Sequence, residues 1–267
     1  MKSAGQWKFT LAGAGNVAWH MGKALAQKGY VIKQVLDRTL SNAKQLAKEF
    51  NAESYGIPED GIAGTDACLI CVSDDAIASV IGQFKPGNCL LMHTAGSVPM
   101  DIFRNHATNY GVLYPLQTFT KDRPLDYSQI PFLIEANTPE NLGRINQIAS
   151  SVSGRIMEAD SAQRLLIHLA AVFASNFSNH MYALAEKLAM EHNMSFDLLK
   201  PLISETTAKA IDLSPRKAQT GPAARDNVKV IEKHLELLKD HPQLQELYRM
   251  ISASIRELPG TLPPGQR

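Results

Sequence analysis

The sequence predicts an α/β protein, in which an N-terminal parallel sheet is followed by an all-α domain. Apolar runs alternate with helical patterns between residues 9 and 157, as in a sheet covered on both faces by helices. A glycine-rich turn separates the first of these runs from the first helix. From residue 161 the apolar positions recur only at helical spacing. We therefore expect a sheet domain over 1–158, a helical domain over 161–258 and a disordered tail over 259–267.

The glycine-rich turn joins a strand at 9–12 to a helix that stops at Gly29. Gly13 permits the tight turn, Gly15 lets a pyrophosphate approach the backbone, and Ala18 lets the helix pack closely on the strand. Free amides and the positive end of the helix dipole then face the anion. This spacing predicts a Rossmann-type dinucleotide site, whose phosphate contacts would come from Gly13, Ala14, Gly15, Asn16 and Val17.

The second strand, at 30–36, ends where the choice of cofactor is made, at Asp37-Arg38-Thr39. An acidic residue here binds the ribose hydroxyls of NAD, whereas a nearby Arg accommodates the 2′-phosphate of NADP. Arg38 and Thr39 favour NADP if Asp37 turns aside, and NAD stays possible. Ser41 is expected to cap a helix at 43–50, which would place further amides beside the phosphate.

Polar residues follow the next two strands, at 67–72 and 89–92, where ligands bind in open α/β sheets. Asp74 either caps the helix at 76–84 or contacts the nicotinamide ribose. His93 and Ser97 either contact a ligand or are satisfied loop and cap residues. The expected cofactor contacts in these two segments are Ser73, Asp74, His93 and Thr94, and Ser97 is expected to contact the substrate.

A strand at 111–119, a strand at 131–135, a helix at 139–152 and a strand at 155–157 complete the expected sheet domain. Tyr114 and Gln117 of the first of these are candidate substrate contacts.

A helix of about 33 residues is expected over 161–193, because no proline interrupts its periodicity. His168 and Asn176 lie eight residues apart and therefore near one face, with Asn179 further on. They are either satisfied structural polar groups or part of a site. Such a helix needs packing along its length, and we expect a homodimer through the helical domain.

Further helices are expected at 196–209, 228–239 and 242–257. The polar loop 213–226 between them is either an exposed connection or a substrate loop. In the second case Thr220 and Arg225 would hold a carboxylate, which Arg binds in bidentate fashion.

Composition excludes several classes of protein. A net charge of +1 argues against nucleic acid as a partner, and no apolar run is long enough to span a membrane. There is no signal-peptide core and no zinc-binding spacing, so we expect a cytoplasmic protein without a metal. Cys68 and Cys71 match a redox spacing, but residues three apart in a strand point to opposite faces, which favours buried, unpaired cysteines.

Six motifs together carry a family resemblance: GAGNVA, DRT, HTAGS, YPLQTF, HLAAVFASNFSNH and TGPAARD. The chain resembles the β-hydroxyacid-dehydrogenase-like superfamily, and within it a bacterial family of Rossmann-like NADP oxidoreductases with a C-terminal helical domain. Pyrroline-5-carboxylate reductase and ketopantoate reductase are similar in plan. In the superfamily the long helix carries a catalytic Lys with Asn residues beyond it. Here His168 is the nearest match to the Lys and Asn176 lies two turns on, while Tyr114 stands where the narrow family tends to have His.

The resemblance implies an NADPH-dependent reductase of a small keto or imino acid, with 2-oxopantoate the first substrate to try. His168 is the candidate proton donor, because imidazole ordinarily titrates near working pH. Asn176 would anchor the substrate oxygen and Arg225 its carboxylate. The alternative is a dinucleotide-binding sensor or interaction protein without turnover, which the missing Lys favours.

Overall fold

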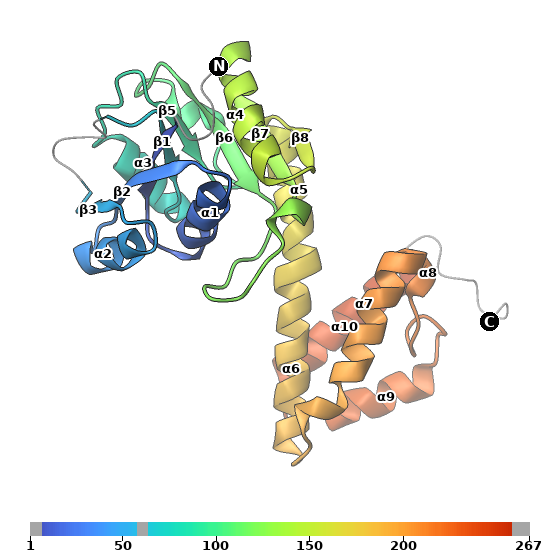
Figure 1. Cartoon of the computed structure of the whole chain (residues 1–267). Helices are drawn as coiled ribbons and strands as arrows, with labels where there is room; N and C mark the ends of the chain where they lie inside the picture. Colours follow the sequence, from blue (N-terminus) through green and yellow to red (C-terminus); the bar gives the residue numbers. More distant parts are fainter. Residues whose placement is uncertain (1–6, 58–63, 258–267) are drawn as a thin grey trace. The chain divides into compact units, whose positions relative to one another are not determined.

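The computed structural model describes residues 7–57 and 64–257. Its sheet has eight strands in the order β3-β2-β1-β4-β5-β6-β7-β8 (Figure 1). All neighbouring strands are parallel except β6 and β7, which are antiparallel. The predicted α/β class is confirmed. The strands are β1 (Lys8–Ala12), β2 (Val31–Leu36), β3 (Glu53–Tyr55), β4 (Ala67–Ile70), β5 (Leu90–His93), β6 (Tyr110–Pro115), β7 (Phe132–Ala136) and β8 (Ile156–Glu158).

Helices cover both faces of this sheet. One core cluster packs α1 (Asn16–Gln27), α2 (Leu40–Lys48) and α4 (Pro139–Val152) against one face. A second cluster packs α3 (Asp74–Ile81) and the 3₁₀ turn Met100–Phe103 against the other. Successive side chains of the central strands alternate between the two clusters, so these strands are apolar throughout and buried on both sides.

The cysteines follow this alternation. Cys68 packs in the cluster beside α3, whereas Cys71 packs in the cluster beside α1. Both thiols are free and buried, and burial raises the pKa of Cys71 to about 12. The expectation of unpaired, buried cysteines is confirmed. Since their pKa values are raised, neither thiol is available as a thiolate for redox chemistry.

The long helix contains a break in its hydrogen-bond pattern that the periodicity did not predict. It runs as α5 (Ser161–Ala171), a π-helical segment (Val172–Phe177) and α6 (Ser178–Glu191). A capping box between Asp160 and Gln163 opens α5. At the end of the π segment the Ser178 hydroxyl donates to the carbonyl of Phe173 at 3.1 Å, which satisfies a carbonyl near the wider turn.

The chain divides into two compact units, Met1–Asn179 and His180–Arg267. The first half of the long helix therefore belongs with the sheet, some 20 residues beyond the boundary expected at 158. The cause is the buried guanidinium of Arg164 in α5, which pairs with Glu135 of β7. It also donates to the carbonyl of Val98 at 2.7 Å, so α5 is tied to the sheet.

The second unit is helical, as predicted. It holds the end of the long helix and a set of shorter helices: the 3₁₀ turn Phe196–Leu198, α7 (Lys200–Leu213), α8 (Pro215–Ala218), α9 (Val228–Leu237) and α10 (Pro242–Glu257). The short α8 lies inside the stretch that was expected to be a loop. The expected disordered tail lies outside the described residues.

One local expectation was wrong, and one strand was not predicted. Helix α2 begins at Leu40 with Thr39 as its N-cap, so Ser41 lies inside the helix. The three-residue strand β3 was not expected, because its side chains are partly exposed and its sequence lacks apolar alternation. Among the helices of the described residues, none is long and apolar enough to cross a membrane.

Candidate dinucleotide and substrate site

The turn between β1 and α1 has the shape that a phosphate site needs. Gly13 has φ +110°, and a Cβ there would lie 2.6 Å from the carbonyl oxygen of Cys71. Only glycine fits this position. A Cβ on Gly15 would meet no atom within 4 Å, and α1 has no side-chain hydrogen bond at its N-cap. The first amides of α1 are therefore open to an anion, and the residues fit a dinucleotide.

Asp37 at the end of β2 is turned toward this loop. Its carboxylate accepts hydrogen bonds from the backbone amide of Ala14 at 2.9 Å and of Thr39 at 2.8 Å. Arg38, between them in sequence, is exposed. The carboxylate of Asp37 is thus bonded to backbone amides. The adjacent exposed side chain, Arg38, is a cation.

Two residues of α1, Asn16 and His20, form hydrogen bonds with the connection between β6 and β7. Asn16 donates to the carbonyl of Phe119 at 3.0 Å and accepts from the amide of Lys121 at 3.2 Å. The buried ring of His20 lies 3.1 Å from the Tyr127 hydroxyl and 2.9 Å from the Thr120 carbonyl oxygen. The Asn16 amide, expected at the cofactor, is therefore engaged with this connection. His20 gave no signal in the sequence beyond its apolar surroundings.

A pocket of about 650 Å³ lies at the carboxyl ends of β4, β5 and β6, facing the end of α5 and the π segment. It brings together sequence-predicted residues from four segments of the chain. Asp74, Thr94, Tyr114, Gln117, His168 and Asn176 all line it. These segments are distant in sequence, and parallel topology places their ends at one edge.

Tyr114 of β6 and His168 of α5 form a polar contact in the lining of this pocket. The Tyr114 hydroxyl lies 3.0 Å from Nδ1 of His168, and the two rings meet edge to face with centroids 6.0 Å apart. Burial raises the pKa of Tyr114, and the negative charge of Asp74 raises it further. The hydroxyl therefore keeps its proton at neutral pH.

Asp74 also accepts a hydrogen bond from the Ser97 hydroxyl. Ser73 is the N-cap residue of α3, and neither a Ser73 nor an Asp74 side chain makes a capping hydrogen bond to the helix. The carboxylate of Asp74 is thus directed to the loop after β5, and of the two roles offered for Asp74 the structure does not show helix capping. Thr94 donates to the carbonyl of Ile70 at 3.3 Å, which joins the two strand ends.

His93 lies inside the core beneath the pocket. It is fully buried, stacks on Phe103 with centroids 5.6 Å apart, and accepts from the amide of Ala95 through Nδ1. Burial, and then the charge of Arg164, lower the pKa of His93 to about 3. Its ring is neutral and has no exposed surface for a ligand, in contrast to the cofactor contact expected from the sequence.

The other predicted residues lie apart from the pocket lining. Ser97 and Asn179 are exposed residues of the first unit that do not line it, and Thr220 and Arg225 belong to the second unit. Their roles stay predictions. Arg164 and Gly96 were missed, because a buried arginine resembles a surface one in sequence and a single glycine in a loop carries little signal.

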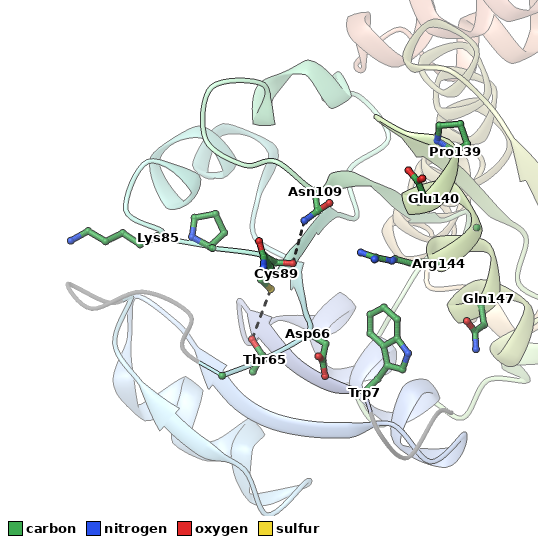
Figure 2. A pocket seen from close by; sticks show the side chains of 15 residues that line it. Trp7, Thr65, Asp66, Lys85, Cys89, Asn109, Pro139, Glu140, Arg144 and Gln147 are labelled. Carbon is green, nitrogen blue, oxygen red and sulfur yellow. Dashed lines mark hydrogen bonds between the residues drawn. The ribbon is translucent and has the colours of Figure 1, made fainter. Parts of the chain in front are cut away.

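A second pocket, of about 960 Å³, lies at the opposite, amino ends of the strands (Figure 2). Trp7, Asp66 and Arg144 are among its lining residues. None of the residues predicted for the site lies there, so this pocket plays no part in the dinucleotide site.

Comparisons with known proteins identify a family and several similar structures. A family model described as a domain of unknown function, DUF2520, matches residues 130–255. A Bacteroides fragilis protein described provisionally as an NADP oxidoreductase is 41% identical, with a TM-score of 0.89, and the match covers 96% of this chain and 100% of that one. No curated protein sequence matches the chain.

More distant structures share the fold. A 1-pyrroline-5-carboxylate reductase from Streptococcus pyogenes is 12% identical with a TM-score of 0.57, over 94% of this chain and 98% of that one. An imine reductase from Streptomyces aurantiacus is 16% identical with a TM-score of 0.60, over 93% and 95%.

Proposed function

The chain belongs to the family of the Bacteroides fragilis protein, and we propose that it is a reductase that uses NADPH to reduce a small 2-oxo or imino acid. One arrangement carries the proposal. The glycine turn with its open amides and the pocket with the Tyr114–His168 pair lie at the same, carboxyl edge of one parallel sheet. The names of the family member and of the distant structures support the same class of reaction.

The residues of the first unit provide for the cofactor at two points. The amides that open α1, beyond Gly15, would bind the pyrophosphate. Asp37 accepts hydrogen bonds from the amides of Ala14 and Thr39, and the exposed Arg38 would bind the 2′-phosphate. This arrangement supports NADP over NAD, because a carboxylate with two backbone partners is less available to ribose hydroxyls.

His168 is proposed to supply the proton of the reaction. NADPH, when bound, would supply the hydride that converts a 2-oxo acid into a 2-hydroxy acid, with NADP⁺ as the other product. The substrate oxygen would take its proton from the protonated ring of His168, which lines the pocket and would be left as a neutral imidazole. Asn176 on the π segment would anchor that oxygen. 2-Oxopantoate is the first substrate to try, in keeping with the ketopantoate-reductase plan.

A homodimer is proposed on the basis of exposed apolar side chains on the long helix and in the second unit. Leu166, Phe173 and Met190 are each more than 60% exposed along the helix. Leu198, Leu202, Ile211 and Leu237 are more than 60% exposed within the second unit. Apolar surface of this extent is typical of an interface, and a second copy of the chain is the proposed partner.

The test is oxidation of NADPH, followed by its absorbance, with a panel of 2-oxo acids and cyclic imino acids. Turnover of one substrate class supports the reductase. Tight NADPH binding without oxidation by any of them would favour the alternative, a dinucleotide-binding sensor, since no Lys occupies the position of His168 on the long helix.

A further inference from the structure

The imidazole of His168 is held from one side only. The Tyr114 hydroxyl lies 3.0 Å from Nδ1. Gly96 packs on the same edge, since a Cβ at Gly96 would lie 2.6 Å from Nδ1 and 2.7 Å from Cγ. Nε2 is on the opposite edge of the ring. Among the described residues no atom is hydrogen-bonded to Nε2, and His168 lines the pocket. This nitrogen is therefore the polar atom that the ring offers to a ligand.

The direction of the Tyr114–His168 hydrogen bond follows from the partners of the hydroxyl. Within the described part of the chain, Nδ1 of His168 is the one hydrogen-bond partner of the Tyr114 hydroxyl. If Nδ1 carried the hydrogen, the phenolic hydroxyl of the buried Tyr114 would have no acceptor among the described residues, which is unfavourable. The hydroxyl therefore donates to Nδ1. A neutral imidazole then carries its hydrogen on Nε2.

We propose that Tyr114 is a positioning residue that fixes His168 with a hydrogen on Nε2, so that the site selects a carbonyl substrate over a protonated imine. The substrate class rests on the proposed function, whereas the tautomer rests on geometry alone. In the neutral ring the pocket-facing nitrogen is N–H, and in the charged ring it is N–H as well. The site thus presents a donor in both states.

This donor discriminates between the two substrate classes left open above. A carbonyl oxygen has lone pairs only and accepts from Nε2–H, which polarises the bond for hydride addition. A protonated imine carries its own N–H and a positive charge, so two donors would face each other and neither would be satisfied. The carboxylate of Asp74 also lines the pocket and accepts from Ser97, and its remaining lone pairs would offset only part of this penalty. We expect a 2-oxo acid to be preferred over the cyclic imine by about tenfold in kcat/KM, the scale of one unsatisfied polar group.

The tautomer is tested by ¹⁵N NMR of the imidazoles in the full-length protein without cofactor, with His168 assigned by the signals lost in His168→Gln. The wild-type ring should show Nε2–H, and Tyr114→Phe, which removes only the hydroxyl, should show a mixture of tautomers. Gly96→Ala places a methyl group against Nδ1 and should give the same mixture independently. An Nδ1–H tautomer in the wild type, or an unchanged ring in both variants, overturns the positioning role.

The second unit offers a matched control. His234 and Tyr248 form the same kind of pair, with the hydroxyl 2.8 Å from Nδ1. Tyr248→Phe should change the His234 signals and leave those of His168 unaltered.

Turnover separates the two parts of the proposal. In the wild type the 2-oxo acid should be the better substrate, and in Tyr114→Phe its turnover should fall about tenfold while NADPH affinity stays within about twofold. A cyclic imine reduced faster than the 2-oxo acid overturns the substrate class. No turnover of either, with the Nε2–H tautomer present, overturns the proposed function and leaves the positioning role supported.

Discussion

The carboxylate of Asp37 accepts a hydrogen bond from the backbone amide of Ala14, 2.9 Å away and 23 residues earlier in the chain. The end of β2 is thereby joined to the glycine turn. An acidic residue at this position is usually considered a reader of the ribose. Here the carboxylate is bonded to the turn itself, and we propose that cofactor choice depends on the neighbouring Arg38.

Arg38→Ala should weaken NADPH binding by about 1.5–3 kcal/mol and leave NADH binding nearly unchanged, because the lost contact is a charge-assisted hydrogen bond to the 2′-phosphate. Kd values by calorimetry for both cofactors measure this. Arg104→Ala, at an exposed arginine paired with Asp101, is the control and should change neither. Equal losses for NADPH and NADH would exclude Arg38 as the phosphate reader.

The homodimer is tested by light scattering at micromolar concentration. We expect twice the chain mass of 29.3 kDa, because a second copy would cover the exposed apolar side chains of the long helix. Leu166→Glu and Phe173→Glu together should shift the mass toward the monomer, whereas Leu40→Glu, at an exposed leucine that begins α2, should not. A monomer for the wild type would contradict the proposal.

Arg164 is the largest fully buried side chain in the described part of the chain. Arg164→Met should lower the free energy of unfolding by about 3–5 kcal/mol, because it leaves the Glu135 carboxylate partly buried without its partner. Denaturant titration measures the change. Arg104→Met, which breaks an exposed pair with Asp101, should lower it by at most about 1 kcal/mol. Similar small losses in both would show that the buried pair does not anchor α5.

The sheet was predictable because its signals are local. Each buried strand is a continuous apolar run, and the glycine turn has a fixed spacing that only a close backbone approach explains, as the 2.6 Å gap at Gly13 shows. The π segment was not predictable, since the hydroxyl of Ser178 and the carbonyl of Phe173 can also occur in an ordinary helix. Helix periodicity alone cannot report one wider turn.

The site was predicted as a set of residues but not as an arrangement. His168 and Tyr114 were separate candidates 54 residues apart, and their contact depends on how α5 crosses the sheet. That crossing is set by Arg164, a residue type that is usually exposed. His93 was expected just beyond a strand ending at residue 92, but it is the last residue of β5 and faces the same side as Leu91, so its ring packs in the core on Phe103.

The depressed pKa of His93 predicts a loss of stability in acid. Between about pH 6.5 and pH 3 the unfolded chain binds a proton that the folded chain does not, so the free energy of unfolding falls as the pH falls. The slope is about 1.4 kcal/mol per pH unit, or about 2 kcal/mol lost at pH 5. His93→Gln should lack this part of the fall, whereas His106→Gln, at an exposed site, should keep it. Parallel pH profiles for wild type and His93→Gln would contradict the prediction.

The strongest test of mechanism is His168→Ala. If His168 donates the proton, turnover should fall by about 10²–10⁴, the usual contribution of general acid catalysis, while NADPH affinity stays within about twofold. A purely structural imidazole would give the opposite result. Removing its hydrogen bond to Tyr114 would lower stability by about 1–3 kcal/mol, and activity per folded molecule would change little.

Thermal stability and turnover, measured on the same sample of His168→Ala, decide between these outcomes. His234→Ala is the control, because the His234 ring forms an equivalent pair with Tyr248 in the second unit. A destabilised but fully active His168→Ala would move the proton donor to Tyr114. Of the two other residues that the sequence offered for this role, His93 is buried away from the pocket, whereas the hydroxyl of Tyr114 lines it and retains its proton. In that case Tyr114→Phe, and not His168→Ala, should abolish turnover.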